Sequence, residues 1–406
     1  MTMQARAPAP SPDTSPPPRS DWWFAVAAIA GAAALIVVVS VLAYTQLPPA
    51  MRRHPTPLET APSGFRWLQA FAWWDGAWYA GIAREGYSFS LGARHQLPVV
   101  FFPAYPLLVR ALTRVGGNTV VDGFLLSLAC GMGAAAVFFQ WCRDHLSPRA
   151  ARLALGCLLV YPGAFYLFGT LYADAMYLLF ALAAFVLLER DRPLAAGLAA
   201  ALAAATRPTG LVLIAGLWLL AIERRGGLGV PGRRRFDLSV LRRRDAGLLL
   251  APTGVAAYAL FLGVRFGNPL LFLEAESGWH QSPGWRTWLK FSWFGRMFKP
   301  PYLEPHHFHL LGHLLVAIVA GALVVVVFRR FGVAYGVYAA TVVGLSAVST
   351  KDFVGLGRYV LAAFPCFAVA GELLAERPRA RGVVLGTSAV LLLFLTHLHA
   401  RNMLIS

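Results

Sequence analysis

One carboxylate stands among aromatic side chains in the stretch FAWWDGAWYAGIAREGY, which covers residues 71–87. The acid is Asp75, and its near neighbours in the chain are Trp73, Trp74, Trp78 and Tyr79. Aromatic rings remove water from around a carboxylate, and such desolvation makes a carboxylate a better proton acceptor. These residues alone favour two interpretations equally: a general base, or an aromatic belt at a membrane surface with an incidental acid.

Two arginines are placed to hold an anion. Arg207 lies in TRPTG, where two short apolar runs meet at a proline, so the backbone is broken at membrane depth. Such a break is tolerated only inside protein or beside a cavity, and an arginine in a cavity suits a phosphate. The alternative, with equal weight, is an arginine that reaches the membrane surface. Arg358, in GRYVLAAFP, is the second candidate, with Tyr359 beside it and Lys351 nearby.

Other polar groups favour structural roles. Asp174, in LYADAMY, opens an apolar run, and we favour a helix N-terminal acid that is stabilised by the helix dipole. A histidine cluster has spacings that fit one helix face, but it lacks a carboxylate partner, which favours a histidine-rich surface loop over a metal site. The cluster is His306, His307, His309 and His313. The sequence therefore indicates no metal site and no cofactor, and it leaves the participation of a divalent cation open.

The composition is that of a membrane protein. The chain is 58% hydrophobic and 14% charged, whereas soluble domains carry roughly 25% charged residues. The net charge of +17 would suggest nucleic acid in a soluble protein. Here the arginines fall in short tracts between apolar runs, which indicates membrane topology and no nucleic-acid partner. The cysteines have no zinc or redox spacing and are interpreted as packing residues, namely Cys130, Cys142, Cys157 and Cys366.

Apolar runs of about twenty residues can each cross a bilayer, and the sequence predicts about eleven crossings. The runs are 24–44, 120–141, 153–168, 173–188, 194–205, 209–222, 246–264, 310–328, 333–349, 359–374 and 383–397, of which 194–205 and 209–222 are short. Residues 1–20, rich in proline, alanine and serine, are expected to be a disordered cytoplasmic tail. Residues 21–406 are expected to form a single transmembrane catalytic domain.

The basic tracts predict an orientation. If each run crosses once, one side of the membrane collects the tracts at Arg143, Arg190, Arg224, Arg329 and Arg377. The positive-inside rule makes that side cytoplasmic, with the N-terminus inside and the C-terminus outside. Two long loops, 45–118 and 265–308, and the segment 351–358 then face the outside of a cell membrane. Residues 279–294 repeat aromatics at helical spacing and predict an interfacial helix.

Six segments, in order, resemble the PIG-V-like (GPI mannosyltransferase II-like) branch of the GT-C polytopic glycosyltransferases. The segments are WDGAWYAGIAREGY, FFPAYPLLVR, YPGAFYLFGTLYADAMYLLF, ATRPTGL, FGNPLLFLEAESGW and GRYVLAAFPCF, which cover most of the chain between residues 71 and 367. The chain departs from the family at Trp73, where members often have arginine, and at Asp174, which is usually glutamate. The second departure suggests a shorter reach at that position.

The resemblance implies an all-α polytopic fold with a long first outer loop that bears the catalytic acid. Asp75 matches that acid. The activity implied is inverting transfer of a sugar, mannose by family, from a polyprenyl-phosphate donor to a lipid, glycan or protein acceptor, within membrane lipid. We predict that the substrates are contacted by Trp74, Trp78, Tyr79, Asp174, Arg207, Lys351, Arg358 and Tyr359.

The chemistry of the residues agrees with such a transfer. A glycosyl phosphate has a good leaving group, so one base suffices while arginines neutralise the phosphate left behind. A glycosidase would need a second placed acid, and nothing in the sequence fixes Glu85 near Asp75. No GxxxxGK[ST] or GxGxxG motif supports a nucleotide sugar. The alternatives are a lipid or sugar transporter or flippase, which would show inverted repeats, and a non-catalytic membrane partner of a transferase.

Overall fold

The computed structural model describes residues 19–52, 61–88, 96–228, 236–279, 284–300 and 305–403. The tail predicted at residues 1–20 lies outside the described residues except for its last two positions, which begin helix α1.

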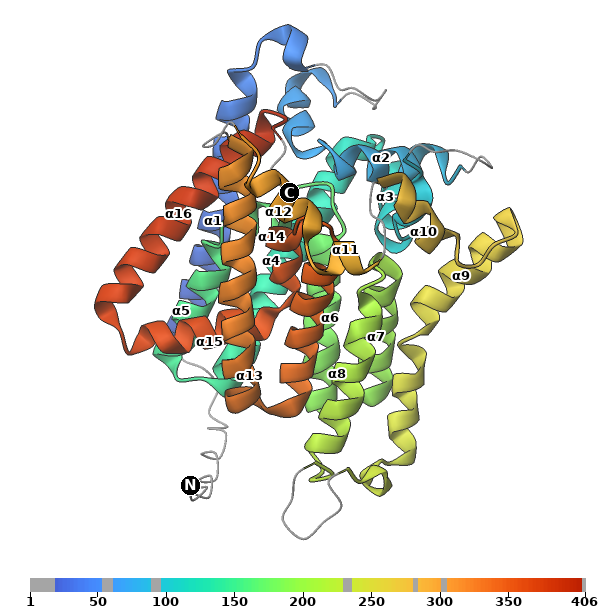
Figure 1. The fold of residues 1–406 in the computed structure, drawn as a ribbon, viewed down its shortest axis with the longest axis vertical. Helices are drawn as coiled ribbons and strands as arrows, with labels where there is room; N and C mark the ends of the chain where they lie inside the picture. Colours follow the sequence, from blue (N-terminus) through green and yellow to red (C-terminus); the bar gives the residue numbers. More distant parts are fainter. Residues whose placement is uncertain are drawn as a thin grey trace.

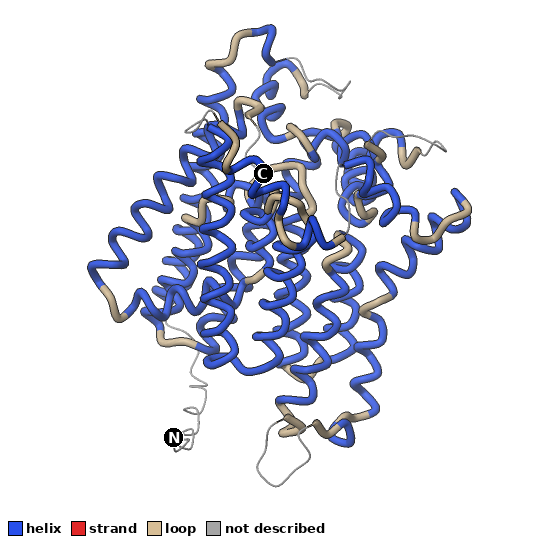
Figure 2. The backbone as a smooth tube through the Cα atoms, viewed as in Figure 1, coloured by secondary structure: helices blue, strands red, loops and turns tan. Residues whose placement is uncertain are grey.

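The described chain is helical, and its β-structure is limited to one isolated bridge between Leu228 and Phe236. The α-helices are α1 (Arg19–Thr45), α2 (Asp75–Glu85), α3 (Ala104–Gly116), α4 (Thr119–His145), α5 (Pro148–Leu159), α6 (Asp174–Glu189), α7 (Pro193–Thr206), α8 (Gly210–Glu223), α9 (Thr253–Phe266), α10 (Leu271–Glu274), α11 (Trp285–Trp288), α12 (Phe291–Met297), α13 (Pro305–Ser349), α14 (Leu356–Tyr359), α15 (Phe364–Ala375) and α16 (Pro378–Ala400). The 3-10 helices are η1 (Pro49–Arg52), η2 (Ser63–Phe71), η3 (Pro98–Val100), η4 (Ala164–Leu167), η5 (Leu238–Val240), η6 (Arg243–Leu250), η7 (Ala275–Trp279) and η8 (Val360–Ala362). Figure 2 shows this helical content along the backbone.

Several helices are suited to cross a membrane. In the described residues, α1, α4, α13 and α16 are long and apolar enough to do so. Two bent pairs could add a span each, η6 with α9 at 40° and α14–η8 with α15 at 84°, while α7 and α8 are shorter apolar helices. The chain is therefore a multi-pass membrane protein. The count of about eleven crossings stays a prediction.

Helix α13 contains two of the predicted runs as antiparallel limbs. Gly332 interrupts its helical geometry with φ 89° and ψ −171°, a conformation that favours glycine. The two ends of α13 lie close together: the Trp293 indole donates to the Leu310 carbonyl (3.2 Å), and the Lys290 ammonium donates to the Thr350 carbonyl. The runs 310–328 and 333–349 thus pack as a hairpin whose turn lies at the lower end of Figure 1.

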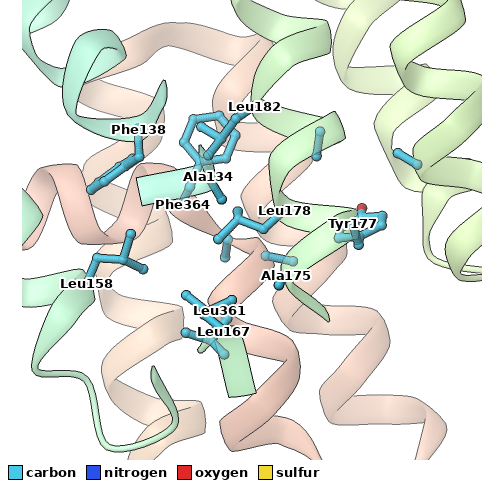
Figure 3. Packing of buried hydrophobic residues seen from close by; sticks show 14 of the residues in the cluster. Ala134, Phe138, Leu158, Leu167, Ala175, Tyr177, Leu178, Leu182, Leu361 and Phe364 are labelled. Carbon is cyan, nitrogen blue, oxygen red and sulfur yellow. The ribbon is translucent and has the colours of Figure 1, made fainter. Parts of the chain in front are cut away.

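Helix α6 lies at the centre of the bundle. It is apolar on every side, as expected for a helix surrounded by protein, and it packs against α4, α7 and α8. Figure 3 shows Leu178 and Leu182 of α6 beside Ala134 and Phe138 of α4. The buried helix fixes the position of its first residue, Asp174.

The two predicted outer loops fold into short helices that gather at one end of the bundle (Figure 1). Helices α2 and α3 pack together, and the Arg110 guanidinium donates to the Ala83 carbonyl at 2.6 Å. The interfacial helix predicted for residues 279–294 is not a single helix. Lys290 takes a left-handed conformation (φ 59°) that separates α11 from α12, although both present exposed aromatics, including Trp285 and Phe294.

Candidate active site

Asp75 is the first residue of α2 and lies at the end of the bundle where the loop helices gather, which we call the site end. The residue before it, Trp74, has φ 55° and ψ −119°, a strained conformation for a non-glycine residue. Tyr172 bridges this turn: the backbone N–H of Asp75 donates to the Tyr172 hydroxyl, which donates to the carbonyl of Trp73, both at 3.2 Å. Strain of this kind, of order 1–3 kcal/mol, persists only where surrounding contacts enforce it, here the two Tyr172 hydrogen bonds, and strained residues cluster at active sites.

Arg358 binds the Asp75 carboxylate. Its Nη1 donates to Oδ2 of Asp75 at 2.5 Å, across 283 residues of sequence, and its Nη2 donates to the Tyr359 hydroxyl at 3.1 Å. Gly355, with φ 81°, turns the chain into α14 and so aims Arg358 at Asp75. The Arg358 guanidinium lies 5.1 Å from the ring centre of Tyr172 and 4.9 Å from that of Tyr359, a geometry for cation–π attraction.

Asp174 joins the two arginines. Arg207, which ends α7 in an extended conformation, donates from Nη2 to Oδ2 of Asp174 at 2.8 Å. The other oxygen of Asp174 lies 3.7 Å from Nε of Arg358, and neither atom makes a hydrogen bond within the described residues. Arg207 also lies 5.1 Å from the ring centre of Tyr359. The structure thus places Asp75, Arg358, Asp174 and Arg207 in one chain of alternating charge, which we call the site network.

The two acids differ in access to solvent. The Asp75 side chain is 23% exposed, whereas that of Asp174 is 2% exposed and that of Arg358 is 9% exposed. Asp75 is therefore the most exposed member of the site network, since the Arg207 side chain is 10% exposed. Asp174 does begin a helix, as the dipole interpretation expects, and it also serves as the counter-ion that the two arginines share.

The tryptophans around Asp75 in the sequence do not enclose it in the structure. Trp73 is buried and points its indole N–H at the Ala400 carbonyl (3.2 Å), while Trp74 is exposed and Trp78 stacks on Phe101. The cause is the turn at the start of α2, which directs consecutive side chains to different sides. The rings nearest the site network come from distant segments: Tyr166, Tyr172 and Tyr359.

Tyr79 is buried on the second turn of α2, against Phe101 and Tyr105. Burial raises the pKa of the Tyr79 phenol well above its usual value, although the charges of Arg207 and Arg358 lower it. The phenol therefore stays neutral at physiological pH and can donate a hydrogen bond.

Lys351 is not brought into the site network. It lies half-buried in the turn after α13, and within the described part of the chain no hydrogen bond or ion pair joins it to these residues. The buried lysine of this region is Lys290, whose ammonium lies 4.6 Å from the ring centre of Phe353. Burial lowers the pKa of the Lys290 ammonium, and the charge of Asp352 acts in the opposite direction.

Glu276, in η7, is a residue that the sequence reasoning did not select. Burial raises the pKa of its carboxyl, and the negative charge of Asp75 adds to that effect, so the two acids interact electrostatically. The segment FGNPLLFLEAESGW contained it, but nothing local distinguished it from Glu274, which is exposed.

The histidines lie at the start of α13, and Nε2 of His309 and Nε2 of His313 are 3.0 Å apart. In the described parts of the chain, no group of three or more His, Cys, Asp or Glu side chains is arranged to hold a metal ion. Three cysteines are buried and Cys157 is half-buried, and all of them are free thiols.

The helical arrangement aligns with crystal structures of ArnT from Cupriavidus metallidurans. The structure bound to undecaprenyl phosphate aligns over 89% of this chain and 63% of that chain, with TM-score 0.51 and 17% identity. The apo structure aligns over 90% of this chain and 62% of that chain, with TM-score 0.51 and 15% identity. This chain thus spans less than two thirds of the length of the ArnT chains. No family model and no curated protein matches the sequence.

The chain is a membrane protein with the all-helical fold of the GT-C glycosyltransferases. The predicted fold class is thereby confirmed, whereas the PIG-V-like branch stays a prediction. At this level of identity the likeness to ArnT is one of fold alone, and a fold does not determine an activity.

Proposed function

We propose that the protein is an inverting membrane glycosyltransferase, which moves a sugar from a polyprenyl-phosphate donor to a hydroxyl of a lipid, glycan or protein acceptor. The site network carries the proposal: one accessible carboxylate, Asp75, is linked through Arg358 to a buried carboxylate and a second arginine. The six-segment resemblance supports mannose as the sugar. The ArnT structure that binds undecaprenyl phosphate supports a polyprenyl phosphate as the carrier.

The arginines provide the phosphate site of this proposal. Arg207 and Arg358 face the same ring of Tyr359 and the same carboxylate of Asp174, so a single phosphate can reach both. A phosphate offers several oxygens in the geometry that a guanidinium fork matches, and it competes with carboxylates for the same donors. As the sugar leaves, negative charge grows on the phosphate, and two preorganised cations stabilise it.

Asp75 provides the base. When the donor phosphate draws Arg358 toward itself, the Asp75 carboxylate loses its hydrogen bond from Arg358 and can accept one from the incoming hydroxyl instead. The acceptor oxygen then bonds to the anomeric carbon as the bond from that carbon to the phosphate oxygen breaks. The bonding electrons leave on the phosphate, and the hydroxyl proton passes to Asp75. Attack from the face opposite to the phosphate inverts the sugar carbon.

Transfer is tested with membranes that contain the full chain and a panel of labelled polyprenyl-phosphate sugars. The expected result is label in a new glycosidic product from one donor, with none in membranes that carry the Asp75→Asn protein. A flippase would move the label across the bilayer without a new glycosidic bond. Product formed equally by wild type and Asp75→Asn protein would contradict the catalytic assignment.

The proposed orientation puts the site end outside the cytoplasm. It follows from the basic tracts, which would lie in the cytoplasm by the positive-inside rule. A Glu85→Cys protein that lacks the native cysteines places a thiol on the exposed end of α2. A membrane-impermeant thiol reagent is expected to label it in intact cells. Labelling only after permeabilisation would mean that the site faces the cytoplasm.

A further inference from the structure

A cavity of about 140 Å³ lies at the end of the bundle opposite to Asp75. It is lined by Leu188, Asp191, Ala221, Arg224, Arg225 and Arg242. Helix α6 connects the two ends, since it begins at Asp174 and ends at Glu189. Its 16 residues rise about 24 Å at 1.5 Å per residue, and Figure 1 shows the helix running along the bundle. The cavity beside Leu188 is therefore well separated from the site network beside Asp174.

Positive charge exceeds negative charge around this cavity. Three arginines line it, namely Arg224, Arg225 and Arg242, and Arg244 approaches the lining residue Asp191. Two carboxylates pair with arginines of this region. Asp191 pairs with Arg244 and lies 3.7 Å from Arg225, and the buried Asp245 pairs with Arg225. Two acids therefore compensate only part of the charge.

The remaining nearby carboxylates bind other groups. Glu189 accepts from the Tyr335 hydroxyl at 2.7 Å and contacts the His145 ring at 2.9 Å. Glu223 accepts the backbone N–H groups of Val333 and Ala334 at 2.9 and 3.0 Å. Within the described residues, neither acid forms an ion pair with an arginine that lines the cavity.

Two of the lining arginines retain hydrogen-bond donors. Arg224 uses Nη1 on the Leu188 carbonyl at 2.8 Å, which leaves its other guanidinium N–H groups. Arg242 uses its backbone N–H on Asp245, and within the described residues its guanidinium has no carboxylate partner. Guanidinium groups bind phosphate oxygens through paired hydrogen bonds, so the cavity matches a phosphate.

The apolar surface beside the cavity indicates a lipid as the source of that phosphate. Residue 247 of η6 packs directly on the backbone of Leu194, at the start of α7. Near this contact between η6 and α7, the side chains of Leu194 and Leu249 are exposed. Exposed leucines next to an arginine cavity, on helices suited to a membrane, match acyl chains below a phosphate headgroup. We propose that this cavity binds the phosphate headgroup of an anionic phospholipid.

The test compares lipid retention by the purified full-length protein. Detergent-solubilised protein is titrated with phosphatidylglycerol or phosphatidylcholine, and bound lipid is counted by native mass spectrometry. Wild type is expected to retain phosphatidylglycerol over phosphatidylcholine. Arg242→Gln is expected to retain about tenfold less phosphatidylglycerol, since one charge-assisted hydrogen-bond pair is lost. The backbone bond from residue 242 to Asp245 does not need the side chain, so the variant should fold, which its melting temperature in phosphatidylcholine checks.

Arg379→Gln is the matched control, because Arg379 is an exposed arginine in the first turn of α16, away from the cavity lining. Its retention is expected to equal that of wild type. The proposal is overturned if wild type shows no preference for phosphatidylglycerol, or if Arg242→Gln and Arg379→Gln behave alike. Displacement of the lipid by an equal concentration of glycerol phosphate would mean a soluble anion site and would overturn the lipid assignment.

Discussion

Each end of the bundle buries an aspartate between two arginines, and the two clusters differ in how many of their polar atoms have a hydrogen-bond partner. At the opposite end, Asp21 of α1 binds Arg143 of α4 and Arg152 of α5, and both of its oxygens are used. At the site end, Asp174 lies between Arg207 and Arg358, but its Oδ1 and the Nε of Arg358 make no hydrogen bond within the described residues. Both aspartate side chains are 2% exposed.

The difference separates an ion cluster that holds helices together from one that is ready for a ligand. A fully paired buried cluster gains nothing from an added anion, which would have to displace a carboxylate. The site network has an unfilled donor, an unfilled acceptor and a partly exposed acid, Asp75. We interpret the Asp21 cluster as structural and the site network as functional, and the following predictions test that contrast.

The largest effect is expected from Asp75→Asn. Asparagine keeps the size of the side chain but cannot accept the proton, and loss of a general base costs about 10²- to 10⁴-fold in rate. Donor affinity should survive, because the phosphate is held by Arg207 and Arg358. The measurement is transfer rate and donor affinity in reconstituted protein. Asp75→Glu should recover little, since misplacement of a catalytic group by about 1 Å can cost on the order of 10².

The matched control for Asp75 is Glu85→Gln, at the exposed end of the same helix. It should leave the transfer rate unchanged. Near wild-type transfer by the Asp75→Asn protein would refute the base assignment. A loss shared by both variants would point to the folding of α2 instead.

Arg358→Gln and Arg207→Gln should each raise the donor KM and lower turnover. Loss of a charge-assisted bond to the phosphate is expected to cost roughly 10- to 100-fold in kcat/KM. The lysine variants should recover only part, because the charge stays while the planar fork is lost. Arg114→Gln, an exposed arginine at the end of α3, is the control. Unchanged kinetics in both glutamine variants would exclude these arginines from the phosphate site.

Asp21→Asn should affect stability and spare catalysis. Removal of the shared acid leaves Arg143 half-buried and without its ion pair. The free energy of unfolding should fall by up to about 3 kcal/mol, which is the low end of the range for broken buried pairs, because Arg152 is exposed to solvent. The measurement is the melting temperature together with turnover per folded molecule. Asp144→Asn, on the exposed end of α4, should change neither quantity. Reduced turnover in folded Asp21→Asn protein would contradict the interpretation that the Asp21 cluster is only structural.

The smallest effect concerns Glu276. Burial, with the charge of Asp75, raises the pKa of its carboxyl in the folded protein above the ordinary value of 4.5, so the folded state binds this proton more tightly than the unfolded state. The ionised form therefore costs stability, and the cost grows as pH rises through the folded pKa. Glu276→Gln should melt at most a few degrees higher than wild type at neutral pH and equally below pH 4.5. A lower melting temperature at neutral pH would contradict this sign.

Much of the fold could be predicted from hydropathy and charge. The run predicted at residues 173–188 is helix α6, and the break predicted at Arg207 separates α7 from α8. These features depend on local composition and on proline, which act within a few residues of the chain. Two separate apolar runs, 310–328 and 333–349, likewise predict the two limbs of the α13 hairpin.

The sequence alone determined that this protein is helical, membrane-embedded and equipped with a small set of acids and arginines at the ends of its apolar runs. Only the tertiary structure decided which of them meet. Asp75 contacts Arg358 from 283 positions away, Tyr172 bridges the turn before α2, and Lys351 stays outside the network. The tryptophan side chains near Asp75 in the sequence point away from it, because consecutive residues at the start of a helix direct their side chains to different sides. The physical reason is that hydropathy depends on each residue's own side chain, whereas an ion pair depends on how distant helices pack and rotate against one another.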